Sequence, residues 1–67
     1  MSQQLDQLAR RIWLQDDGAV RLLSTLSDRS RRGVEKALRA MYGVRVSLFG
    51  SETEVRERLL AVHRLVY

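Results

Sequence analysis

Five cationic side chains on one short stretch are the residues of this chain best placed to do chemistry. Arg29, Arg31, Arg32, Lys36 and Arg39 all lie between Ser27 and Gly43. A guanidinium group can pair bidentately with a phosphate, a carboxylate or the edge of a guanine, and an ammonium group contacts phosphate as a point charge. The stretch therefore predicts a surface for an anionic partner.

The charge of the whole chain is concentrated in the same region. The 67 residues carry a net charge of +4, but residues 18–50 contain seven cationic and two acidic side chains, which is +5. The segments before and after residues 18–50 are close to neutral. Localised positive charge favours nucleic acid or an acidic protein as partner.

A helix is expected to position these cations, and we predict it over residues 28–42. Ser27 or Asp28 can cap its start, and Gly43 can end it in a left-handed conformation. Four apolar residues recur at the spacing of one helical face: Val34, Ala37, Leu38 and Met41. At about 100° per residue, four of the five cations fall roughly opposite that face: Arg29, Arg32, Lys36 and Arg39.

Three further helices are predicted around this one. They cover residues 3–14, 18–26 and 52–66, with Ser2 and Asp17 as caps of the first two. Ser51 and Glu54 form a capping box at the start of the last. The chain is thus expected to be a mainly α, single small helical domain over residues 1–67.

One short strand is predicted over residues 44–49, between Gly43 and Gly50. Apolar and other residues alternate there, which is typical of a half-buried strand. A lone strand leaves unpaired backbone groups, and a chain this short has a small core. We therefore expect a homodimer, formed by strand or last-helix pairing. Its interface, or that of another partner, would use Val44, Val46, Leu48, Val55, Leu59, Val62 and Val66.

A partial helix-turn-helix pattern spans the second and third helices. Val34, Leu23 and Ala37 match apolar positions of that motif, and Ser24 matches a position where a small residue lets the helices cross. Asp28 stands at the usual glycine of the turn, and Arg29 at a position that is normally apolar. The match is incomplete, and it implies no family.

Helix-stabilising ion pairs are a competing explanation for the arginines. Six of them follow an acid at i+4, the favourable orientation: Asp6–Arg10, Asp17–Arg21, Asp28–Arg32, Glu35–Arg39, Glu52–Arg56 and Glu54–Arg58. These pairs would leave Arg29, Lys36 and Arg31 as the unexplained part of the cationic stretch. A solvated surface remains the alternative to a binding site.

The sequence contains no pattern typical of a metal site, a cofactor site, an active site or a membrane span. There is no cysteine, His63 is the only histidine, and glycines are isolated, so we expect no metal, no cofactor and no enzymatic activity. His63 is expected to be a packed, hydrogen-bonded residue. No apolar run is long enough for a membrane span, and we expect a cytoplasmic protein with no membrane partner.

Two functions remain open at this point. The first is a small DNA-binding regulatory protein that uses the basic helix 28–42. The second is an adaptor or inhibitor that occupies the surface of one cellular protein through its last helix or its strand edge.

Overall fold

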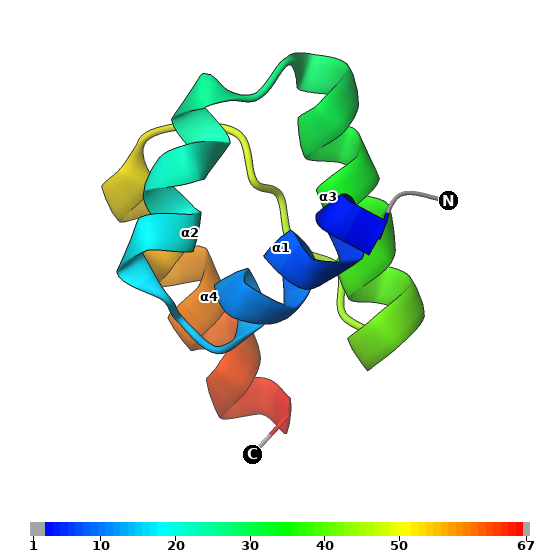
Figure 1. Cartoon of the computed structure of the whole chain (residues 1–67). Helices are drawn as coiled ribbons and strands as arrows, with labels where there is room; N and C mark the ends of the chain where they lie inside the picture. Colours follow the sequence, from blue (N-terminus) through cyan, green and yellow to red (C-terminus); the bar gives the residue numbers. More distant parts are fainter. Residues whose placement is uncertain (1–2, 67) are drawn as a thin grey trace.

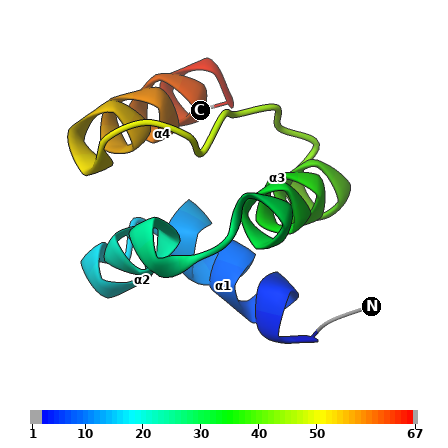
Figure 2. The ribbon, with the colours of Figure 1, turned by 90° about the horizontal axis from the view of Figure 1, so that it is seen from above.

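The computed structural model describes the backbone of residues 3–66, and four α-helices make up most of it. They are α1 (Gln3–Trp13), α2 (Asp17–Leu22), α3 (Asp28–Tyr42) and α4 (Glu52–Val66), and a 3-10 turn, η1 (Leu23–Thr25), follows α2 directly. Helix α1 packs against α3 and α2 (Figure 1). Seen from above, α4 lies opposite α1 and α2, and the segment that follows α3 leads across to it (Figure 2).

The mainly α prediction is confirmed, and the predicted bounds of α3 and α4 agree with the structure. The second helix is shorter than predicted, because its expected last turn is the 3-10 turn η1. The hydroxyls of Ser24 and Thr25 donate to the carbonyls of Arg21 and Leu22 at 2.8 and 2.7 Å. Such local side-chain bonds compete with the regular helix.

The cap of α2 is Asp16 and not Asp17. One carboxylate oxygen of Asp16 accepts from the N–H groups of Gly18 and Ala19, at 2.9 and 3.3 Å. The other oxygen pairs with Arg11 at 3.1 Å, which ties the end of α1 to the start of α2. Asp17 is thereby free to pair with Arg56 of α4.

The remaining predicted caps within residues 3–66 are confirmed. Ser27 accepts from the N–H of Ser30 at 3.2 Å, and Gly43 ends α3 with φ of 67°. Ser51 and Glu54 form the capping box, with the N–H of each donating to the side chain of the other. Ser2, the expected cap of the first helix, lies outside the described residues.

The predicted strand over 44–49 is wrong. No strand occurs within residues 3–66, and the segment 43–50 is an unpaired connection between α3 and α4. The alternation instead records packing on the core, because Val44 and Leu48 are buried while Arg45 and Ser47 are exposed.

Side chains replace a neighbouring strand as hydrogen-bond partners of this segment. The N–H of Leu48 donates to the carboxylate of Glu35 at 2.8 Å. The carbonyls of Ser47 and Phe49 accept from the guanidinium of Arg58 on α4. The connection is therefore fixed to both flanking helices.

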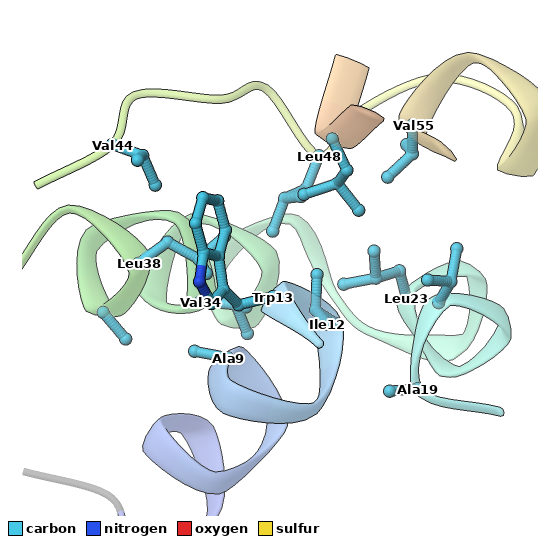
Figure 3. Packing of buried hydrophobic residues seen from close by; sticks show 13 residues of the cluster. Ala9, Ile12, Trp13, Ala19, Leu23, Val34, Leu38, Val44, Leu48 and Val55 are labelled. Carbon is cyan, nitrogen blue, oxygen red and sulfur yellow. The ribbon is translucent and has the colours of Figure 1, made fainter. Parts of the chain in front are cut away.

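The core lies where these elements meet. Ile12, Leu38, Leu48 and Leu59 come from three helices and the connection, and each is exposed by no more than 1%. Figure 3 shows Leu48 and Val55 approaching this cluster from the side opposite α1. The connection 43–50 is thus part of the core.

None of the helices within residues 3–66 has the length and apolar character needed to cross a membrane.

Asp16 makes the stability of this fold sensitive to acid. The hydrogen bond from Arg11, followed by that from the Ala19 N–H, lowers the pKa of Asp16 below its usual 3.8. A carboxyl with a lowered pKa in the folded state stabilises the protein above its unfolded pKa, and that contribution is lost as the pH falls through the folded pKa. We predict that Asp16→Ala lowers the melting temperature at neutral pH by a few degrees.

The same variant should lose less stability than the wild type when melting is followed from pH 6 down to pH 2 by circular dichroism. Asp16→Asn is the matched control, because it keeps a capping oxygen and removes the charge. An Asp16→Ala variant with the melting temperature and the acid dependence of the wild type would contradict this role.

Candidate polyanion-binding surface

Four exposed cations share one side of α3, and we call Arg29, Arg32, Lys36 and Arg39 the basic face. The opposite side of the helix carries Val34 and Leu38, which are fully buried. The apolar contacts with the core therefore fix the rotation of α3, and with it the direction of the basic face. The predicted grouping of these four cations on one side of the helix agrees with the structure.

The basic face makes no ion pair with any other side chain that the structure describes. Five ion pairs connect side chains of residues 4–65, and none includes a member of the basic face. The predicted pair of Glu35 with Arg39 is absent, and Glu35 instead accepts from the N–H of Leu48. The pair of Asp28 with Arg32 is absent as well.

The ion-pair explanation of the arginines therefore fails on α3 and holds on α4. Of the six predicted i,i+4 pairs, the structure forms Glu52–Arg56 at 2.6 Å and Glu54–Arg58 at 3.4 Å. Glu52, and after it Asp17, raises the pKa of Arg56 above its usual value. The acids on and beside α4 support the fold, and none of them pairs with the basic face.

Arg31 belongs to the interior side of α3 and not to the basic face. Its guanidinium donates to the carbonyl of Leu23 at 2.6 Å and lies 5.0 Å from the centre of the Phe49 ring. Its Nε is buried and makes no hydrogen bond to the described residues. Arg31 therefore joins η1, α3 and the connection 43–50, and it lies apart from the basic face.

Grooves border α3 on two sides. One runs beside the first half of the helix, where Leu5 of α1 faces Arg29 and Lys36. The other runs beside its second half and is closed by the connection 43–50, with Val46 and Arg45 in its wall. Arg32 and Lys36 line both grooves, so the basic face lies between them.

Gly33 lies on α3 where the side chain of Leu5 from α1 packs against it. The helix is regular through Gly33. A Cβ at Gly33 would lie 2.8 Å from Cδ1 of Leu5. The glycine thus leaves room for the Leu5 side chain.

Arg45 is a cation that the sequence reasoning left out of the site. It is exposed, and it lines the second groove together with Arg32, Lys36 and Arg39. Its position depends on how the connection 43–50 packs along α3. The helical period of residues 28–42 gives no information on that packing.

The predicted interface residues lie mainly in the core of this chain. Val44, Leu48, Val55 and Leu59 are exposed by 1–5%, and Val46 and Val62 pack against them partly buried. The side chain of Val66 lies outside the described residues. These buried residues are satisfied by intramolecular packing, and the homodimer stays a prediction.

Three rings from distant parts of the chain stack on one another. Trp13 lies between Tyr42, at a centroid distance of 5.1 Å, and His63, at 3.9 Å. His63 is also hydrogen-bonded through Nε2 to the carbonyl of Trp13 at 2.7 Å, which confirms it as a packed residue. Trp13 is 6% exposed, so this stack serves the fold and is not open to a ligand.

Nowhere in the described part of the chain do three His, Asp or Glu residues gather as metal ligands.

Comparison of the chain with protein-family models, with curated proteins and with solved structures finds no match. The candidate site is therefore described from the positions and contacts of its own residues alone.

Arg31 makes contacts within the fold, whereas its neighbour Arg32 is exposed on the basic face. Alanine variants of the two residues should therefore differ in stability. Arg31→Ala should lower the free energy of unfolding by about 1–3 kcal/mol, because it removes a charged hydrogen bond and the contact with Phe49. Arg32→Ala should change it by less than about 0.5 kcal/mol, as an exposed and unpaired side chain. Urea unfolding followed by far-UV circular dichroism measures both, and equal effects would contradict the assignment of Arg31 to the interior.

Proposed function

We propose that this protein is a small DNA-binding regulator that contacts duplex DNA through the basic face of α3. The observation that carries the proposal is the set of four exposed cations on a single helix, none of which makes an ion pair with a described residue. In an ordinary solvated helix surface we expect acids and cations to be interspersed and paired, as they are on α4. Helix α3 has two acids: Glu35 accepts from the Leu48 N–H, and Asp28 makes no ion pair with the basic face in the described part of the chain.

The shape of the surface favours a duplex. The major groove of B-DNA is about 12 Å wide and admits an α-helix. A helix bordered by a groove on each side can enter it, since the phosphate backbones on either side of the major groove then have room. Arg29 and Arg32 lie near the start of α3, the part of a recognition helix that meets base edges, and Lys36 and Arg39 suit phosphate contacts.

The partial helix-turn-helix pattern supports the same docking. Helix α2 and the turn η1 precede α3 directly, and α1 packs against both α2 and α3. The alternative, an adaptor that binds through its last helix or a strand edge, keeps the exposed Leu60 and Leu65 of that helix as its support. Val55 and Leu59 of that helix are buried inside the chain, and there is no strand within residues 3–66.

Two double variants with the same loss of charge test this proposal. Arg32→Gln with Lys36→Gln removes half of the basic face, and Arg10→Gln with Arg64→Gln removes two exposed cations elsewhere. Binding of a short fluorescein-labelled duplex of mixed sequence is measured by anisotropy over a range of salt concentrations. We expect the first variant to bind more weakly and to lower the slope of log K against log salt by about two.

The control variant should retain the slope of the wild type, because its cations lie off the basic face. Far-UV circular dichroism should be the same for all three proteins. Equal losses in both variants would mean that binding follows net charge alone. Absence of wild-type binding at low salt, or tighter binding of polyglutamate than of the duplex, would overturn the proposal in favour of an acidic protein partner.

A further inference from the structure

Beyond the basic face, the groove between α3 and the connection 43–50 has the features of a track for a phosphodiester backbone. Three of its cations come from the helix, and the fourth, Arg45, comes from the connection. The acid in its wall, Glu35, is held by the N–H of Leu48 at 2.8 Å. Cations therefore line both walls of one groove. The fold brings Arg45 of the connection close to the cations of α3.

The wall that carries Arg45 is held in place. Val44 and Leu48, on either side of Arg45, are buried in the core at 5% and 1% exposure. Glu35 anchors the connection to α3, and Arg58 anchors it to α4 through the carbonyls of Ser47 and Phe49. Arg45 therefore projects from a fixed segment, so little backbone entropy is lost when it contacts a ligand.

The hydrogen-bond pattern also gives the groove a backbone donor. Polar groups of successive residues in an extended segment point to opposite sides. The carbonyls of Ser47 and Phe49 face Arg58 of α4, and the N–H of Leu48 faces Glu35 of α3. The N–H of Val46, in the same connection, has no acceptor among the described residues. Backbone N–H groups are common phosphate donors.

We propose that one strand of a bound duplex runs its phosphates through this groove, with Arg45 and the Val46 N–H contacting them from the connection 43–50. This proposal rests on DNA binding by α3. It adds a second element to the site, and it orients the duplex, because the strand that follows the second half of α3 must pass between the helix and the connection.

The test compares two single variants that remove the same charge from exposed positions. Arg45→Gln lies in the groove, and Arg64→Gln lies on α4 outside it. Anisotropy of the labelled duplex is again measured against salt. Arg45→Gln should weaken binding roughly two- to fivefold and lower the salt slope by about one. Arg64→Gln should match the wild type.

The outcome separates this inference from the function on which it rests. If Arg45→Gln binds like the wild type while Arg32→Gln with Lys36→Gln loses affinity, the groove carries no phosphate and the inference fails, while DNA binding by α3 stands. If Arg45→Gln and Arg64→Gln weaken binding equally, Arg45 acts through net charge and the inference also fails. If the wild type does not bind the duplex, both proposals fail together.

Discussion

The bond from the Leu48 N–H to the carboxylate of Glu35 is the interaction on which most of this structure depends. It holds the connection 43–50 against α3, and this places Leu48 in the core between the N-terminal helices and α4. It also engages the acid that was predicted to pair with Arg39 one turn further along the helix. This contact thus joins the core to α3, and the four cations of the basic face lie on the opposite side of the helix.

The division of labour among charged residues follows from this arrangement. The acids at the start of α4 and in α2 pair with Arg56 and Arg58, so they hold α4 and the connection in place. Arg31 is used inside the fold as well, through the Leu23 carbonyl and the Phe49 ring. Among the described residues, the exposed cations without an ion pair are the four of the basic face, Arg45, Arg10 and Arg64, and only the first five lie together on and beside α3. The proposed function rests on these five, which is a smaller set than the number of arginines in the sequence suggests.

The sequence predicted the features that depend on local spacing. The period of residues 28–42, the caps at Ser27 and Gly43, and the capping box of α4 all follow from short-range rules, and the structure agrees with them. Two local details were missed, the cap at Asp16 and the 3-10 turn that ends the second helix, and the larger errors came from contacts between distant residues. The alternation of apolar residues over 44–49 correctly indicated one buried side, but it does not distinguish a paired strand from an irregular segment that packs on the core. The i,i+4 rule considers side chains of one helix only, so it does not include the bond of Glu35 to the backbone N–H of Leu48. Arg45 entered the site for the same reason, because its neighbours are set by tertiary packing.

The most direct test of the account is a titration of the uniformly ¹⁵N-labelled protein with a short DNA duplex, followed by the shifts of backbone amide resonances. Binding through the basic face and its flanking groove predicts shifts concentrated in α3 around Arg29 to Arg39 and at Arg45 to Ser47. The amides of α4 and of the Trp13 region should stay in place. Shifts centred on α4, or spread evenly over all exposed arginines, would contradict the assignment of α3 as the nucleic-acid-binding surface.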